Sequence, residues 1–218
     1  MSLPSEEFYR IGKLPPYVFA QVNEMKARLR AAQYDVVDFG MGNPDGATPR
    51  FVFLSERHRD ALAHLLFAVI GPGDAVVSPN PAYPIHQWGV IMAEGHACML
   101  PMPTPAEFLN QLKDLYRKQA KKPKMILISF PHNPTTHCVD LDFMKEIVAL
   151  AREHGTMVVH DFAYADIAFD GYKPPSILEV EGAKENCVEI FSMSKSYNMA
   201  GWRMGFCVGI PRLIHALG

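Results

Sequence analysis

Residues 125–161 read MILISFPHNPTTHCVDLDFMKEIVALAREHGTMVVHD, and the pattern of this stretch decides the fold class. Two short apolar runs, Met125–Phe130 and Met157–His160, lie on either side of Leu141–Glu153, whose apolar residues recur at helical spacing. Two strands joined through a helix are typical of parallel pairing, because the chain must cross back over the sheet before the second strand begins. The stretch therefore predicts a strand–helix–strand unit.

The same alternation continues on both sides of this unit. Strand-like runs recur at Ala75–Ser78, Ala97–Leu100, Val188–Phe191 and Phe206–Gly209, and helical segments at Ile85–Ala93 and Pro105–Ala120. This order predicts an α/β fold with a mainly parallel sheet flanked by helices. The run Phe206–Gly209 follows Val188–Phe191 too closely for a helical crossover, so we expect it to pair in the antiparallel direction.

The N-terminal part of the sequence is organised differently. Pro15 and Pro16 favour a helix that begins just after them, over residues 17–33. Residues 40–46 are rich in Gly, Asn and Pro and predict a loop, and residues 56–70 have a helical pattern. We therefore expect an arm and helices ahead of the sheet.

Composition excludes several classes of protein. The chain has 218 residues, of which 49% are hydrophobic and 20% charged, and its net charge of −2 gives no electrostatic reason to expect a nucleic acid or an anionic membrane as a partner. The longest apolar run, Leu65–Ile70, is too short to span a bilayer, and residues 1–7 lack the pattern of a secretory signal. The four cysteines have no C-x-x-C spacing, so we expect them to be reduced and mostly buried in a cytoplasmic protein.

Polar residues gather where the predicted strands end. Asn133 follows the run 125–130, Asp161 and Tyr164 follow the run 157–160, and Ser192, Ser194 and Lys195 follow the run 188–191. Parallel α/β sheets bind their ligands in the crevice outside the carboxyl ends of the strands. We therefore expect these side chains to converge on one edge of the sheet.

Residues 192–205, SMSKSYNMAGWRMG, carry the clearest chemical signal. One lysine, Lys195, is flanked by serines, and Arg203 follows it eight positions later. An amine can hold an aldehyde, while hydroxyl groups and a guanidinium can hold a phosphate. A site for pyridoxal phosphate needs this combination of groups.

The segment resembles the cofactor-lysine motif of the class I and II aminotransferases, S-x-S-K-x-x-x-x-x-G-x-R-x-G. Three other segments are similar to motifs of that family: P-x-Y-P at residues 81–84, N-P-T at 133–135 and D-x-x-Y at 161–164. The family has the fold type I architecture and depends on pyridoxal 5′-phosphate. The resemblance implies that residues 51–218 form part of the cofactor-binding large domain, and residues 1–50 an N-terminal arm and helix.

The resemblance also implies catalytic roles. Lys195 would form a Schiff base with the cofactor and then act as a base on the substrate. Asp161 would keep the pyridine nitrogen protonated, so that the ring can accept electrons from the substrate. Tyr164 would share the ring 3-oxygen with Asn133. Lys195, Asp161 and Tyr164 are the expected catalytic residues.

Other motif residues would bind the cofactor. Tyr83 would stack on the ring, as its P-x-Y-P segment implies. Ser192, Ser194 and Arg203 would bind the phosphate, the arginine through its bidentate fork. Trp202, which lies between Gly201 and Arg203, is expected to pack in the core rather than to take part in the chemistry.

Within the family, the sequence is most similar to the alanine (glutamate–pyruvate) and diaminopimelate aminotransferases. This similarity implies that Gly42 and Asn133 lie beside the substrate. It also implies transamination between an amino acid of the alanine or glutamate type and a 2-oxo acid, in amino acid metabolism, by a homodimer.

Departures from the family pattern leave a second hypothesis open. Arg50 and Phe51 join segments that family members separate by several tens of residues, and Thr136 stands where the family usually has Gly. After the cofactor segment the sequence also lacks the small C-terminal domain, which supplies the arginine for the substrate carboxylate. The sequence looks like an incomplete aminotransferase, and the alternative function is a catalytically inert cofactor-binding or interaction fragment.

A metal site is a further alternative at this edge of the sheet. His132, His137, His160 and Asp161 are residue types that bind zinc. Their spacing matches no compact ligand motif, so we expect no metal.

Overall fold

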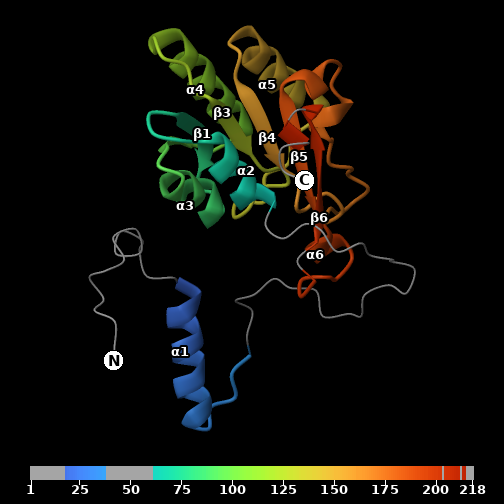
Figure 1. Ribbon diagram of the computed structural model, residues 1–218. Helices are drawn as coiled ribbons and strands as arrows, with labels where there is room; N and C mark the ends of the chain where they lie inside the picture. Colours follow the sequence, from blue (N-terminus) through green and yellow to red (C-terminus); the bar gives the residue numbers. More distant parts are fainter. Residues whose placement is uncertain (1–17, 38–60, 203, 212, 215–218) are drawn as a thin grey trace. The chain divides into compact units, whose positions relative to one another are not determined.

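The computed structural model describes residues 18–37, 61–202, 204–211 and 213–214 (Figure 1). The chain divides into two compact units, Met1–Gly42 and Asn43–Gly218. The boundary expected at residue 50 lies outside the described residues, so the predicted domain division stays a prediction.

The described part of the first unit is dominated by the helix α1 (Val18–Ala31). Glu24 and Arg28 form an ion pair one turn apart on its exposed surface. Arg28 and Arg30 lie in the last turn, where positive charge interacts favourably with the helix dipole. The helix predicted over residues 17–33 is thus confirmed for its described part.

The described part of the second unit contains a six-stranded sheet (Figure 1). Its strands are β1 (Ala75–Asn80), β2 (His96–Pro101), β3 (Met125–Ile128), β4 (Met157–Asp161), β5 (Cys187–Ser192) and β6 (Gly205–Gly209). They lie in the order β2-β1-β3-β4-β5-β6. The first five are parallel, and β6 pairs with β5 in the antiparallel direction. Both the mainly parallel sheet and the antiparallel last strand are confirmed.

Helices cover both faces of this sheet. They are α2 (Ala61–Val69), α3 (Pro84–Met92), α4 (Pro105–Lys118), α5 (Leu141–Glu153) and α6 (Met193–Ser196), with the 3-10 turns η3 (Ile177–Glu179) and η4 (Ala183–Glu185). The predicted α5 has the predicted bounds, and α3 and α4 lie within two residues of theirs. Residues 56–60 of the helix predicted over 56–70 lie outside the described residues. The short elements η3, η4 and α6 were not predicted.

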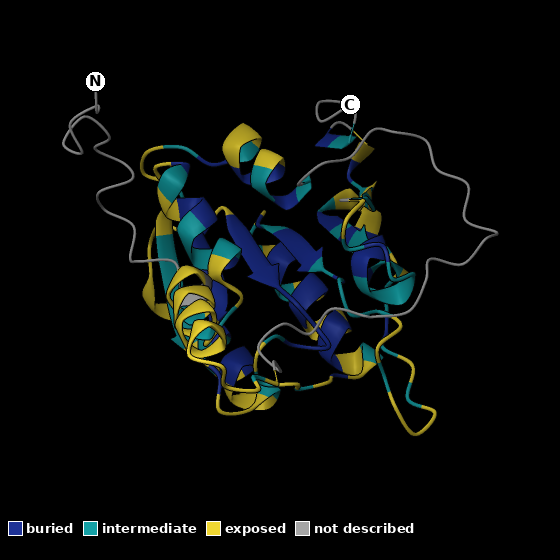
Figure 2. Ribbon diagram, turned by 90° about the horizontal axis from the view of Figure 1, so that it is seen from below, coloured by how far each residue is buried: buried dark blue, intermediate teal, exposed yellow. Residues whose placement is uncertain are grey.

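Two separate apolar cores result from the alternation of side chains along the strands. Val158 packs with α4, α5 and η3, whereas its neighbour Val159 packs with α2 and α3. Figure 2 shows the central strands as the most buried layer, with helices whose outer sides are exposed. The sheet therefore has an α2/α3 face and an α4/α5 face, and the pleat decides which face each residue reaches.

Helix α5 shows how the sequence builds the α4/α5 face. Asp140 caps its start, because the Asp140 side chain accepts a hydrogen bond of 2.9 Å from the Phe143 amide. The residues that it buries recur at helical spacing: Phe143, Met144, Ile147, Val148 and Ala151. They cover β3 and β4 in one apolar core.

The cysteines differ from the expectation that they are mostly buried. Cys187 is buried, Cys98 and Cys207 are half-buried, and Cys138 is exposed. Cys98 and Cys207 lie on the two outermost strands of the described sheet, β2 and β6, where fewer neighbours cover them. All four are free thiols. No helix in the described ranges combines the length and the apolar character that a membrane crossing requires.

Gly205 is required by the close approach of β6 to β5. It pairs with Ser192, and a Cβ built on Gly205 would lie well under 3.0 Å from the carbonyl oxygen of Phe191. Gly201, four residues earlier, has no atom of the described residues within 4 Å of such a Cβ. The glycine at position 205 therefore serves strand pairing, and none of the described residues restricts the space beside Gly201.

We expect Ile147→Ala to lower the free energy of unfolding by about 2–5 kcal/mol, since it leaves a cavity beneath the buried face of α5, where Ile147 is 0% exposed. Ile147→Val removes one methylene group and should cost about 0.5–1.5 kcal/mol. Urea denaturation followed by circular dichroism measures both changes. Equal stabilities for the alanine and valine variants would show that this face is not tightly packed.

We expect Gly205→Ala to lower the free energy of unfolding by about 1–3 kcal/mol, because a methyl group there overlaps backbone rather than a side chain that can move. Gly201→Ala is the matched control, with the same atoms added four residues away in open space. It should leave stability unchanged within about 0.5 kcal/mol. The same denaturation experiment serves, and a larger loss at position 201 than at 205 would contradict this account.

Candidate functional site

The carboxyl ends of β1, β3, β4 and β5 meet at one edge of the sheet, and the polar motif residues lie there. Asp161 is the last residue of β4 and Ser192 the last of β5. Tyr83 follows β1 and precedes α3, and Asn133 follows β3. Because the four strands are parallel, the separate motifs approach one another as the sequence predicted.

Asp161 contacts a histidine from the helix after β1. His86 Nε2 donates to Asp161 Oδ2 at 2.9 Å. The His86 side chain is 1% exposed and that of Asp161 14%, so this hydrogen bond is largely shielded from water. A shielded carboxylate needs hydrogen-bond donors to offset its lost hydration, and His86 supplies one.

Sequence analysis did not identify His86 as part of the site. It lies three residues after Tyr83, in the first turn of α3, so one helical turn carries both rings to the same edge. Their ring centroids lie 6.1 Å apart in an edge-to-face arrangement. The signal that could have identified His86 is this spacing, because the motif residue Tyr83 fixes where the start of the helix lies.

Tyr164 and Asn133 form a second contact at this edge. The Asn133 amide donates to the Tyr164 hydroxyl at 3.3 Å. Burial raises the pKa of the Tyr164 hydroxyl, the nearby Asp161 and Tyr83 raise it further, and the hydrogen bond from Asn133 opposes them. Tyr164 therefore keeps its proton at neutral pH and can donate it in a hydrogen bond. The same electrostatic influences show that Asp161, Tyr83 and Asn133 all lie around this hydroxyl.

Lys195 lies in the short helix α6, which begins directly after β5. Asp161 is the register partner of Ile190, and Lys195 follows Ile190 by five residues. Lys195 and Asp161 thus belong to the ends of adjacent parallel strands. The structure brings the amine-bearing and acid-bearing segments to the same edge.

Hydroxyl groups line the turn that carries Lys195. Ser192 caps α6, and its Oγ accepts a hydrogen bond of 3.3 Å from the Ser194 amide. Ser194 is buried, and the buried Ser196 hydroxyl has no hydrogen-bond partner among the described residues. A buried hydroxyl without a partner is uncommon in a folded protein, and a polar ligand could satisfy it.

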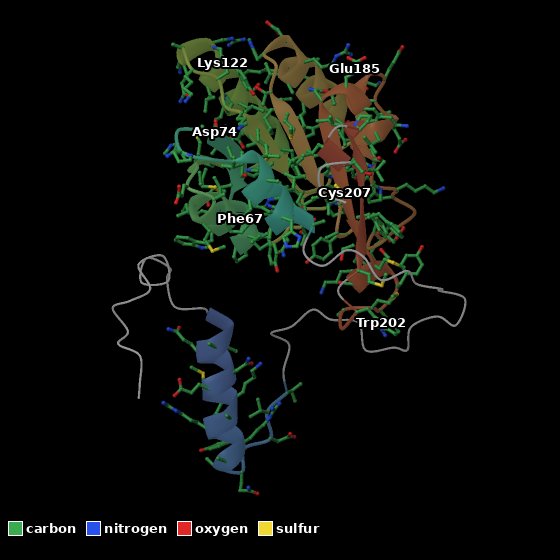
Figure 3. The ribbon with its side chains drawn as sticks, viewed as in Figure 1. Phe67, Asp74, Lys122, Glu185, Trp202 and Cys207 are labelled. Atoms are coloured by element: carbon green, nitrogen blue, oxygen red, sulfur yellow. The ribbon has the colours of Figure 1, made fainter. Side chains whose placement is uncertain are left out.

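Other predicted site residues differ in outcome. Gly42 and Arg203 lie outside the residues that the structure describes. Trp202, which the sequence suggested to be core packing, is 59% exposed, and Figure 3 shows it on the turn beyond α6. That expectation was wrong: the Trp202 side chain is left uncovered, whereas Met199 of the same turn is fully buried.

Two histidines near Asn133 are linked through a threonine hydroxyl, and of these residues only His132 is buried. The Thr135 hydroxyl lies 2.8 Å from His132 Nδ1 and 2.7 Å from His137 Nδ1. Burial lowers the pKa of His132 to about 4, with further contributions from the nearby His86 and His137, so His132 is neutral at pH 7. Across the described residues, no group of three or more metal-binding side chains converges.

A cavity in the described part of the second unit lies beside this edge. It has a volume of about 500 Å³ and is lined by residues that follow β4, among them Phe162, Asp166 and Lys173, and by Phe191 of β5. Asp161 and Lys195 do not line it. Chemistry rather than cavity size identifies the candidate site, because the acid, amide, phenol, amine and hydroxyl groups all lie at the strand ends.

The groups at this edge match the parts of pyridoxal phosphate. A shielded carboxylate suits a protonated ring nitrogen, and the Asn133–Tyr164 pair suits a phenolic oxygen. The exposed ring of Tyr83 offers a stacking surface, and the unpartnered Ser196 hydroxyl with Ser192 and Ser194 offers donors to a phosphate. The residues present therefore fit the cofactor.

Comparisons with known proteins agree with this fit. Residues 35–218 match the family model described as aminotransferase class I and II. The glutamate-pyruvate aminotransferase AlaC of Escherichia coli (strain K12) is 40% identical over 261 aligned positions, which cover 98% of this chain and 63% of that protein. The LL-diaminopimelate aminotransferase of Desulforudis audaxviator is 34% identical and covers 97% of this chain, which spans 66% of that enzyme.

Solved structures agree on the fold. The substrate-bound structure of BacF from Bacillus subtilis superposes with a TM-score of 0.84 at 26% identity, over 100% of this chain and 66% of that one. Aspartate aminotransferase from Thermotoga maritima gives a TM-score of 0.82 at 22% identity, over 96% of this chain and 68% of that one. The second likeness supports the fold type I architecture alone.

The chain is shorter than these relatives. It spans 63–66% of the length of the curated proteins named above. The alignment with AlaC has 261 positions, 43 more than the 218 residues of this chain, so at least 43 positions of AlaC stand opposite gaps. With most of its length matched to the family model and with these motifs at one sheet edge, the chain belongs to the class I and II aminotransferases, a family that depends on pyridoxal phosphate.

Proposed function

We propose that this protein acts in transamination between an amino acid and a 2-oxo acid, with pyridoxal phosphate held as a Schiff base on Lys195. The hydrogen bond between His86 and Asp161, at the same sheet edge as Lys195, carries the proposal. It fixes a carboxylate where a cationic ring nitrogen would need one. The relatives named for glutamate–pyruvate and LL-diaminopimelate transamination support an amino donor of the alanine or glutamate type.

Each residue at the edge has a distinct task in this proposal. When bound, the cofactor supplies the electron-withdrawing ring that stabilises negative charge at the substrate α-carbon. Asp161 holds the proton on the ring nitrogen, and His86 keeps the Asp161 carboxylate oriented toward it. Lys195 supplies the amine that holds the aldehyde and that later removes the α-proton. Tyr164 and Asn133 donate to the ring oxygen.

The remaining assignments complete the proposal. Tyr83 stacks on the ring, and Ser192 and Ser194 bind the phosphate together with Arg203. Gly42 and Asn133 lie beside the substrate. Residues 51–218 belong to the large domain and residues 1–50 to an arm with a helix. The protein is a cytoplasmic homodimer without a metal.

We expect Lys195→Ala to abolish the visible absorption that pyridoxal phosphate gives with the purified protein, because the variant has no amine at this position to bond the aldehyde. Exchange of amino groups should be lost at the same time. Lys184→Ala, which removes an exposed lysine from η4, is the matched control and should keep both. Retained absorption in Lys195→Ala would remove this lysine from the site.

The same absorption measurement on the unsubstituted protein separates transamination from the inert alternative. Yellow protein that turns colourless on addition of alanine or glutamate is catalytic, because the amino group has moved to the cofactor. Yellow protein that does not respond to either amino acid is a binder without turnover. Protein that stays colourless with added cofactor would contradict the proposed site.

We expect Asp161→Asn to bind the cofactor but to lose at least about a hundredfold in the rate of amino-group exchange, since a neutral amide cannot hold the ring nitrogen in its cationic form. The amide keeps the size of the side chain and can still accept from His86. Stopped-flow absorbance with a saturating amino acid measures the rate. An unchanged rate in this variant would remove Asp161 from the mechanism.

A further inference from the structure

A second buried acid–imidazole pair lies behind the site, on the α4/α5 face of the sheet. His160 of β4 and Glu189 of β5 are register partners across the two strands. His160 Nδ1 lies 2.9 Å from Glu189 Oε2, with the side chains 0% and 11% exposed. The ring of Phe162 covers the imidazole at a centroid distance of 4.7 Å. The four motif segments named above, residues 81–84, 133–135, 161–164 and 192–205, include neither member of this pair.

Glu189 is held by three donors, two at the start of η3 and one on β4. Its Oε1 accepts from the Ser176 hydroxyl at 2.8 Å, and its Oε2 accepts from the Ile177 amide at 2.9 Å as well as from His160. Ser176 caps η3, so the carboxylate ties that turn to β4 and β5. Because the carboxylate can only accept, Nδ1 of His160 must carry the proton in this contact.

The other nitrogen of His160 faces the backbone of Phe130. His160 Nε2 lies 3.4 Å from the Phe130 amide nitrogen and 3.2 Å from its carbonyl oxygen. A neutral ring accepts from that N–H, and a protonated ring donates to that carbonyl. In either state the imidazole holds the backbone of Phe130, which lies three residues before Asn133.

The pleat prevents His160 from reaching the cofactor edge itself. Asp161, the next residue, turns to the α2/α3 face, where it meets His86. His160 turns the opposite way, to Glu189. Its hydrogen bonds to Phe130 connect it to the Phe130–Asn133 segment, which carries the amide that donates to Tyr164.

We propose that His160, held by Glu189, is a positioning residue that fixes the Phe130–Asn133 segment and thereby aims the Asn133 amide at the cofactor ring. The proposal rests on the proposed function for the identity of the ligand. It adds a buried support that starts at η3, passes through Glu189 and His160, and ends at the Asn133 loop.

Two substitutions separate the contacts of His160. In His160→Gln the longer side chain places its amide where Nε2 lies, so it can bond both the N–H and the carbonyl of Phe130. In His160→Asn the shorter side chain places its amide where Nδ1 lies, toward Glu189, and leaves Phe130 unsupported. Tyr116→Phe is the matched control, because it removes a buried hydrogen bond of 2.8 Å, to Thr156, on the same face.

The measurement is a titration of each purified protein with pyridoxal phosphate, followed by the visible absorption and its dependence on pH. We expect His160→Asn to bind about fivefold to tenfold more weakly, as the loss of one supporting hydrogen bond implies, and to shift the pH midpoint of the absorption band. His160→Gln should restore both toward the wild-type values. Tyr116→Phe should lower the melting temperature without changing either.

Equal binding and equal midpoints in His160→Asn and His160→Gln would overturn the proposal. So would changes in Tyr116→Phe as large as those in His160→Asn, because they would reflect general destabilisation. A second measurement needs no cofactor: hydrogen exchange of the Phe130 amide should be faster in His160→Asn than in the wild type and His160→Gln. Equal exchange in all three proteins would also overturn it.

These experiments distinguish the two proposals. If the wild-type protein gives no visible absorption that depends on Lys195, the proposed function fails. The exchange rates at Phe130 still test whether His160 supports the Asn133 loop. If absorption appears as expected but exchange and binding do not respond to position 160, only the positioning role fails.

Discussion

The parallel alignment of β1, β3, β4 and β5 is the constraint on which the site depends. Each strand ends at the same edge, and a polar motif residue follows or ends each of them. In the sequence these residues lie far apart: successive members of the series Tyr83, Asn133, Asp161 and Lys195 are separated by 28 to 50 positions. A parallel strand cannot be reached by a tight turn, so a helix or long loop must intervene, and these covering segments exclude water from the core below. The edge itself stays open at the strand ends. A shift of one strand by two residues would move its polar group by about 7 Å, which is enough to separate the acid from the phenol and amide.

Neighbouring residues on β4 serve opposite faces of the sheet. Asp161 meets His86 on one face, and His160 meets Glu189 on the other, so two acid–imidazole pairs enclose the end of the strand. Buried charged groups cost desolvation energy, and they persist where each is hydrogen-bonded on all sides. Glu189 meets this condition with three donors from protein, whereas the group at Asp161 lies at an edge open to a ligand. The pair of His160 and Glu189 therefore suits support, and the pair of His86 and Asp161 suits chemistry.

The sequence predicted the helices and strands more completely than the contacts and the exposure of individual side chains. Periodicity identified α5 and the six strands, because a buried face imposes 3.6-residue or two-residue spacing on many positions at once. The convergence of Asn133, Asp161 and Tyr164 followed from one rule about strand ends. His86 was not predicted because its partner Asp161 lies 75 residues away in the sequence, and the only local signal is its spacing of three residues from Tyr83. The exposure of Trp202 and of Cys138 escaped for a related reason: burial is decided by which segments cover a residue, and hydrophobicity alone does not reveal them. The roles of Gly42 and Arg203 remain predictions from the motifs.

The part of the site that faces the cofactor ring is built within one unit of the chain. Tyr83, His86, Asn133, Asp161 and Tyr164 all come from residues 83–164, and the strands that carry them pair directly or through β3. Their geometry therefore depends on strand pairing and on the two cores, both of which consist of described residues. The selection of an amino donor requires groups that contact the substrate side chain and carboxylate. The family resemblance implies that other segments, such as the small C-terminal domain, supply these groups. Under the proposed function, binding of the ring and choice of the substrate would thus depend on different groups, so that a loss of one would not imply a loss of the other.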